Sequence, residues 1–212
     1  NAITVQSLNY YNNFTNITAY GNTGTAFSIS TSFDNFINGL LSYNNSNGIS
    51  FNSAHRNTFY NINLSNHSTT GVNVFTSSNN TFVNISSLNN SVYGIRVSGL
   101  NNTFTNTVAL YNRQYDFSAA NQVNGTSFTD SILANYSIAN PALLTFRNTS
   151  VGEIKFTNAI NASGLNLLGN DSSDIRIENN SVYFNASVSG LNSSANITLY
   201  NIGDRGYIIP VI

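Results

Sequence analysis

Apolar and polar residues alternate along most of the chain, and β-branched and aromatic types dominate the apolar positions. Pairs of apolar residues two positions apart recur in successive units: Phe27 and Ile29, Ile49 and Phe51, Val72 and Val74, Ile95 and Val97. A period of two is typical of strands that bury one face. Short clusters of Asn, Ser and Gly separate these segments and suit tight turns. The pattern therefore predicts many short strands and leaves no room for helices.

A polar phrase repeats at a regular interval along the first two thirds of the chain. It reads "RNTFYNI" at 56–62, "NNTFVNI" at 79–85 and "NNTFTNT" at 101–107. Its alignment predicts a column of phenylalanines 22 to 24 residues apart: Phe14, Phe36, Phe59, Phe82, Phe104 and Phe128. A second column follows two residues later: Asn16, Asn38, Asn61, Asn84 and Asn106, then Asp130.

A unit of 22 to 23 residues can bury its phenylalanine only against a neighbouring unit, which is the logic of a solenoid. Strands in a sheet lie about 4.8 Å apart, so equivalent residues of successive coils would stack. We expect an all-β parallel β-helix of about nine coils, with both columns as internal ladders. A single domain would span 1–212, with regular coils in 1–135 and degenerate coils and a C-terminal tail in 136–212.

The corner "NNTF-x-N" followed by "G-I/V-x-V" resembles the repeats of right-handed parallel β-helices in the pectate-lyase-like superfamily. The likeness includes the Asn-rich surface versions found in archaea and bacteria, and it covers residues 10–135. The resemblance implies a right-handed winding. It says little about activity, because one fold carries many functions.

The repeat weakens after Asn135, where "IANPALLTF" breaks the pattern at Pro141. Alternating apolar pairs return at Ile154 and Phe156, Ile175 and Ile177, Ile197 and Leu199. We interpret them as degenerate coils that would stack Glu153 and Lys155 beside Asp174, Arg176 and Glu178 on the outer face. A small β-sandwich beginning near residue 140 is the alternative.

Charge and composition exclude several classes of function. Only 7% of the residues are charged and the net charge is −1, so there is no basic surface for nucleic acid. No segment is apolar enough to span a bilayer. Cysteine is absent, which excludes disulfides and thiolate metal sites. Methionine is absent too, and we expect Asn1 to be the end left after removal of a signal peptide.

The acceptor motif for N-glycosylation, N-x-S/T, occurs 18 times among 41 asparagines. With 49 Ser and Thr in 212 residues, roughly nine would arise by chance. Such motifs mark surface positions of secreted proteins, and covalent N-linked glycans would keep a nearly neutral surface soluble. The predicted sites lie in or near turns: Asn13, Asn44, Asn66, Asn79, Asn89, Asn101, Asn124, Asn148, Asn170, Asn179 and Asn192. Asn16 and Asn84 also match, but we expect the internal ladder to hide them.

No catalytic or metal site is expected. A glycosidase needs two carboxylates that face one groove, and only Asp174 and Glu178 come near that arrangement. Arg176 lies between them, which favours an ion-paired surface over a catalytic pair. His55 and His67 are twelve residues apart, about half a coil, and should face different directions. We expect no cofactor besides the glycans.

These features predict a secreted, N-glycosylated structural protein of the cell surface, such as a subunit of an extracellular filament or surface layer. Its expected partners are copies of itself, joined head-to-tail through the coil ends and the apolar tail Tyr207 to Ile212, and surface glycans. Two alternatives on the same fold are a polysaccharide lyase or hydrolase, and a glycan-binding attachment fibre.

Overall fold

The computed structural model describes residues 1–121, 123–179 and 181–202, and every regular element in them is a strand. Sheet 1 contains β1 (Ile3–Gln6), β3 (Thr25–Ser30), β5 (Asn47–Asn52), β7 (Thr70–Phe75), β9 (Tyr93–Val97), β11 (Tyr115–Ala119), β14 (Tyr136–Ile138) and β17 (Ser163–Gly164). Sheet 2 contains β2 (Asn13–Tyr20), β4 (Phe36–Tyr43), β6 (Thr58–Ser65), β8 (Thr81–Leu88), β10 (Thr103–Leu110), β12 (Asn124–Thr129), β13 (Ile132–Leu133), β15 (Leu143–Asn148), β16 (Gly152–Phe156) and β20 (Ala195–Leu199). A separate hairpin pairs β18 (Ile175–Glu178) with β19 (Ser181–Phe184).

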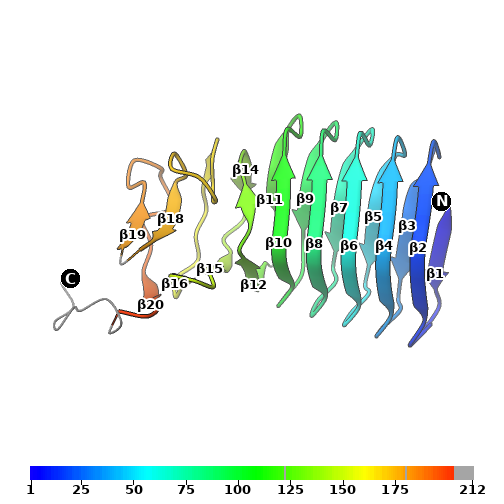
Figure 1. The fold of residues 1–212 in the computed structure, drawn as a ribbon, viewed down its shortest axis with the longest axis horizontal. Coiled ribbons are helices and arrows are strands. Elements are labelled where there is room, and N and C mark those ends of the chain that lie inside the picture. Colours follow the sequence, from blue (N-terminus) through cyan, green and yellow to red (C-terminus); the bar gives the residue numbers. More distant parts are fainter. Residues whose placement is uncertain (122, 180, 203–212) are drawn as a thin grey trace.

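The chain alternates between the two sheets, and the strands pair in parallel from β1 to β14 in sheet 1 and from β2 to β15 in sheet 2. This arrangement is a parallel β-solenoid (Figure 1). In Figure 1 the near strands of sheet 2 run upward while the coils advance from right to left, so the winding is right-handed. The predicted fold class is confirmed. The predicted number of about nine coils is wrong, because the solenoid has about six turns.

One aromatic row forms the centre of the core. Strand register aligns Phe14, Ile37, Phe59, Phe82, Phe104, Phe128 and Phe146. The rings of Phe82 and Phe104 stack with centroids 4.5 Å apart, and those of Phe104 and Phe128 with centroids 5.0 Å apart. Stacked rings of this kind add to the area burial that stabilises a core.

The prediction that Phe36 belongs to this row is wrong. Phe36 pairs with Asn13 and Thr58 on the outer face and is 39% exposed, whereas Ile37 is fully buried. Because side chains alternate along a strand, a shift of one residue moves a side chain to the opposite face. "NFI" offers two adjacent apolar residues, and the letter Phe alone does not tell which one points inward.

Two corners of each coil pair a left-handed residue with a residue that turns inward, and asparagine doublets occupy several of these corners. At both corners the first residue adopts a left-handed conformation: Asn79 and Asn101 at the first corner, and Asn44, Asn66 and Asn89 at the second. Asparagine tolerates this conformation better than most residues. The second residue of each doublet turns inward, which sets the register of the strand that follows.

These inward residues build two buried ladders. The first buried ladder passes side-chain amide hydrogen bonds of 2.8 to 3.2 Å along Asn12, Asn35, Asn57, Asn80 and Asn102. The second buried ladder runs through Asn22, Asn45, His67, Asn90 and Asn112 and ends at Asp116. Each ladder satisfies polar groups that would otherwise be buried without partners.

The predicted asparagine column is a third ladder, but it lies outside the core. Amide bonds of 3.0 to 3.2 Å link Asn38, Asn61, Asn84 and Asn106 along the coils. Asn16, Asn61 and Asn106 are exposed and Asn84 is half-buried, so the expectation of an internal column is wrong. The reason is a left-handed kink in the middle of each long strand, which turns the side chains of Asn16, Asn61, Asn84 and Asn106 outward. In β4 the kink falls on Gly39, so Asn38 lies one residue off the predicted column.

After Asn148 the chain reverses direction, and the prediction of degenerate coils is wrong. β16 pairs antiparallel with β15 and with β20, and β17 pairs antiparallel with β14. Asp130 holds the reversal, because its carboxylate accepts hydrogen bonds from the amide and hydroxyl of Thr149 at 2.9 and 2.8 Å.

The charged residues of this region do not stack as predicted, and no separate sandwich forms. Lys155 pairs across the sheet with Thr145 and Asn196, while Arg176 lies on the β18–β19 hairpin. β16, β17 and β20 extend sheets 1 and 2, so the alternative of a β-sandwich beginning near residue 140 is not observed either. The antiparallel strands and the hairpin lie at the C-terminal end of the coil stack (Figure 1).

Candidate functional site

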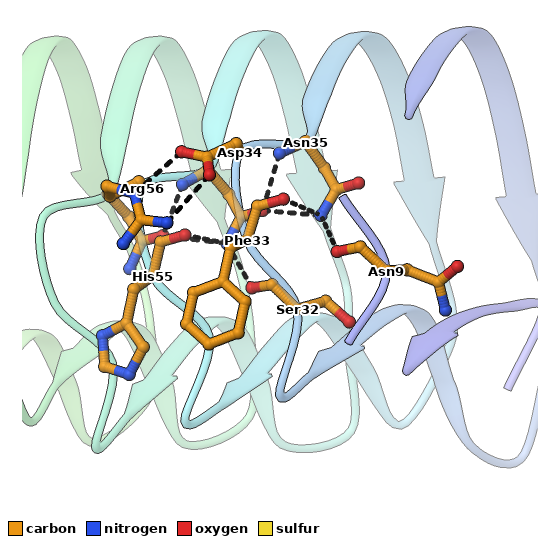
Figure 2. A network of polar contacts seen from close by, with 9 residues as sticks. Asn9, Ser32, Phe33, Asp34, Asn35, His55 and Arg56 are labelled. Atoms are coloured by element: carbon orange, nitrogen blue, oxygen red, sulfur yellow. Dashed lines mark hydrogen bonds and ion pairs between the residues drawn. The ribbon is translucent and has the colours of Figure 1, made fainter. Parts of the chain in front are cut away.

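A polar and aromatic network lies on the first corner (Figure 2). Arg56 donates two hydrogen bonds, of 2.9 and 2.8 Å, to the carboxylate of Asp34 one coil away. The hydrogen bonding from Arg56 is the main cause that lowers the pKa of Asp34 below its usual range. The ring of Phe33 stacks between Tyr10 and His55, at centroid distances of 5.3 and 5.5 Å. Ring faces in this stack cover one another, so the network stabilises the corner rather than offering flat faces to a sugar.

The predicted glycosylation positions lie on the surface. Ten of the eleven asparagines are exposed, and Asn148 is half-buried. Five of them are the left-handed corner residues Asn44, Asn66, Asn79, Asn89 and Asn101. Asn16 is exposed and Asn84 half-buried, so the reason given for leaving them unmodified does not hold. Asn84 does donate its amide to Asn61 at 3.0 Å.

The corners also explain why the acceptor motif is so frequent. Each corner needs a left-handed residue, then an inward ladder residue, and next a residue that begins the following segment. Asn-Asn-Thr and Asn-Asn-Ser meet these needs, because Asn suits the first two positions and a hydroxyl residue suits the third. Five of the 18 motifs begin at a left-handed corner asparagine, so part of the excess has a structural cause, whether or not sugars are attached. Exposure of the corner asparagines is the observation that bears on modification.

Asp174 and Glu178 do not share a site. Asp174 is 7% exposed and accepts hydrogen bonds from the Tyr136 hydroxyl at 2.9 Å and the Asn185 amide at 2.8 Å. Glu178 is exposed and lies 3.3 Å from Arg176. Burial, with the bond to Asp174, raises the pKa of Tyr136, so the phenol stays a donor. The pair is structural in this arrangement.

Removal of the Tyr136 hydroxyl should destabilise the junction between coils and hairpins. Tyr136→Phe keeps the buried ring but leaves Asp174 with one fewer donor, so we expect a loss of about 1–3 kcal/mol in the free energy of unfolding. Urea denaturation measures it. Tyr183→Phe is the control, because Tyr183 is 42% exposed and its hydroxyl loss should change little. Equal stabilities of the wild type and Tyr136→Phe would contradict the buried bond.

A cleft of about 330 Å³ separates the last coil from the β18 hairpin. Its charged lining comprises Asp130, Arg147, Asp171, Arg176 and Glu178. Several of these charges already have partners: Asp130 bonds Thr149, and Arg176 donates to the Asp171 carbonyl at 3.1 Å besides pairing with Glu178. The cleft therefore holds nearly balanced charge rather than a pair of carboxylates facing an open groove.

The two histidines lie in different environments. His55 belongs to the external stack, whereas His67 is fully buried in the second buried ladder. Among residues 1–121, 123–179 and 181–202, no group of three or more His, Asp or Glu side chains could hold a metal ion. No helix in this described part is long and apolar enough to cross a membrane.

Sequence reasoning missed both buried ladders. The available signal was a spacing: in the regular coils the core residue follows two positions after the inward asparagine, as Phe59 follows Asn57 and Ile37 follows Asn35. His67 takes an asparagine's place, which its neighbours Asn45 and Asn90 in the aligned doublets reveal.

Comparison of the chain with family models, with curated proteins and with solved structures found no match. Its assignment as a parallel β-solenoid accordingly stands on the strand pairing itself.

Proposed function

We propose that this protein is a secreted, N-glycosylated structural protein of the cell surface, a subunit of an extracellular filament or surface layer. The exposure of the corner asparagines within N-x-S/T motifs carries the proposal. Those asparagines project from rigid corners whose inner halves are tied into ladders, so glycans there would not disturb the core. The finer assignment to the pectate-lyase-like superfamily rests on the resemblance of the repeat.

The bonding of the described carboxylates supports a structural role. In the part of the chain that the structure describes, Asp116, Asp130 and Asp174 accept hydrogen bonds that fix the backbone or a buried side chain. Asp116 and Asp174 are buried as well, and buried carboxylates engaged in this way are poor general acids or bases, because catalysis needs a group within reach of a substrate.

Contact between copies would involve the coil ends. β1 and β2 lie at one end of sheets 1 and 2, and unpaired strand edges readily recruit other chains. At the other end the antiparallel strands β17 and β20 follow the last parallel coil. The tail Tyr207 to Ile212 lies outside the described residues, and its proposed docking on a neighbouring copy stays a proposal.

Electron microscopy and intact-mass measurement of the protein purified from its source test this function. We expect filaments or sheets, and a mass above that of the 23.0 kDa chain by whole numbers of glycans. Unmodified, monodisperse monomer in such material would contradict the proposal.

A glycan-binding fibre or polysaccharide-degrading enzyme is the second candidate. One observation favours ligand binding: the cleft is lined by polar side chains of both charges, and Arg147 is exposed beside it. The separation of Asp174 from Glu178 speaks against hydrolysis by this pair, so binding is the stronger of the two alternatives.

A further inference from the structure

We propose that neighbouring corner asparagines of one column exclude each other as glycan acceptors, so that glycans occupy alternate coils. This inference rests on the proposed glycosylation. It concerns the second-corner column, which consists of Asn44, Asn66 and Asn89 on three successive coils. Of these, Asn66 is the one expected to stay unmodified when its neighbours carry sugar.

The three asparagines are stacked in register. The backbone amide of Asn44 donates to Ser65, that of Asn66 to Leu88 and that of Asn89 to Leu110, at 3.2 to 3.3 Å. The same bond recurs between each pair of successive coils, so the three asparagines lie one above another. All three have φ of 54°, so their side chains leave the corner in the same direction. Each is exposed, whereas the residue after it is buried in the second buried ladder.

Space between the attachment points is set by the strand spacing. Adjacent parallel strands lie about 4.8 Å apart, so the three amide nitrogens repeat at about that distance. Across its plane, a pyranose ring with its substituents is wider than this spacing, so sugars on adjacent coils fit only with their rings stacked face to face, and the glycan chains that extend from them crowd each other. Two sugars on adjacent coils would therefore compete for one volume, and the rigid ladder beneath prevents the corners from separating.

Neighbours make Asn66 the most restricted position. Asn66 has an acceptor asparagine on both sides. The same column continues with Gly21 beyond Asn44 and with Tyr111 beyond Asn89, and neither of these can carry an N-linked glycan. A sugar on Asn44 can lean over Gly21, which has no side chain, and a sugar on Asn89 meets only the exposed ring of Tyr111. A sugar on Asn66 would meet another sugar on either side.

The chemistry of attachment does not relieve the restriction. A bond forms between Nδ2 of the asparagine and the anomeric carbon of the sugar. The bond from that carbon to the phosphate oxygen of a glycosyl-phosphate donor breaks, and the amide proton is released. Each addition requires that Nδ2 reach a bulky donor, which an occupied neighbour hinders further.

Glycopeptide mass spectrometry on the folded protein from its source, or from a host that glycosylates it, tests the proposal. In the wild type we expect chains that carry sugar on Asn44 and Asn89 but not on Asn66. The variant Ser46→Ala with Ser91→Ala removes both neighbouring motifs and keeps all three asparagines at their corners. In this variant the occupancy of Asn66 should rise several-fold.

Ser194→Ala is the matched control, because it removes the Asn192 motif outside the column by the same kind of change. It should leave Asn66 unoccupied. Folded chains with sugar on all three asparagines would overturn the exclusion, as would an Asn66 that stays empty in the double variant. Absence of glycan from every site would instead overturn the proposed function, so the two failures are distinguishable.

Discussion

Replacement of Phe82 by alanine is expected to lower the free energy of unfolding by about 3–5 kcal/mol. Phe82 is fully buried, and its ring lies 4.5 Å from that of Phe104 and 5.6 Å from that of Phe59. The cavity would interrupt the aromatic row in the middle of the solenoid, where parallel coils on both sides limit collapse. Urea denaturation followed by circular dichroism measures the loss.

Phe36→Ala is the matched control, because it removes the same side chain from the outer face of β4, which lies two coils away in the same sheet. Its expected cost is below about 1 kcal/mol. The comparison tests the strand register directly. If Phe36→Ala cost as much as Phe82→Ala while Ile37→Ala cost little, the assignment of Ile37 to the interior row would be wrong. The two denaturation curves should have equal slopes, and a lower slope for one variant would indicate that its solenoid unfolds in parts.

Acidification is expected to destabilise the solenoid through His67. Burial lowers the pKa of His67 from 6.5 to about 4. Nδ1 of the ring accepts the backbone amide of Asn45 at 3.2 Å, so the neutral ring carries its proton on Nε2, which faces Ser42 Oγ at 3.3 Å. A second proton, on Nδ1, would point at the backbone N–H of Asn45, so two donors would face each other and the second buried ladder would break.

The sign follows from proton uptake in the two states. Above pH 6.5 the ring is neutral in both the folded and the unfolded chain, so His67 adds no pH dependence. Between pH 6.5 and 4 the unfolded chain binds a proton that the folded chain does not, and stability falls by on the order of 3 kcal/mol. Urea denaturation at pH 7, 6, 5 and 4.5 measures this loss.

His67→Asn is the informative variant, because asparagine continues the ladder between Asn45 and Asn90 and cannot take up a proton. We expect this variant to lose less stability than the wild type from pH 7 to 4.5. His55→Asn, on the external stack, should retain the acid sensitivity of the wild type, since His67 is still present. Parallel loss of stability in the wild type and His67→Asn would refute the role of His67.

Much of the coil architecture could be predicted from the sequence. A period of 22 to 23 residues, alternation within each unit and the near absence of proline predict stacked parallel strands. The alignment of Phe59, Phe82 and Phe104 in one row was predicted correctly, because phenylalanine recurs at the same position of each repeat. Phe36 shows where this prediction fails. Phe36 and Ile37 are adjacent apolar residues, so the sequence does not tell which of them points inward. The hydrogen bond of Asn35 in the first buried ladder decides it.

The candidate site was only partly predictable. The motifs at Asn44, Asn66 and Asn89 are visible as letters, but their alignment in one column depends on the coil register. The internal partners were missed, because Asn90 reads like any polar turn residue until its amide is seen to bond Asn112 at 2.8 Å. Likewise, the spacing of Asp174 and Glu178 suggested a shared face, whereas Tyr136 draws Asp174 into the interior.

By itself the sequence determined the repeat and the strand period, because these follow from local patterns that recur in every coil. Only the tertiary structure decided which asparagine of each doublet turns inward, and where parallel winding stops. The physical reason is that both depend on contacts between distant residues. An inward amide needs the next coil as its partner, and the reversal after Asn148 needs Asp130 to hold Thr149.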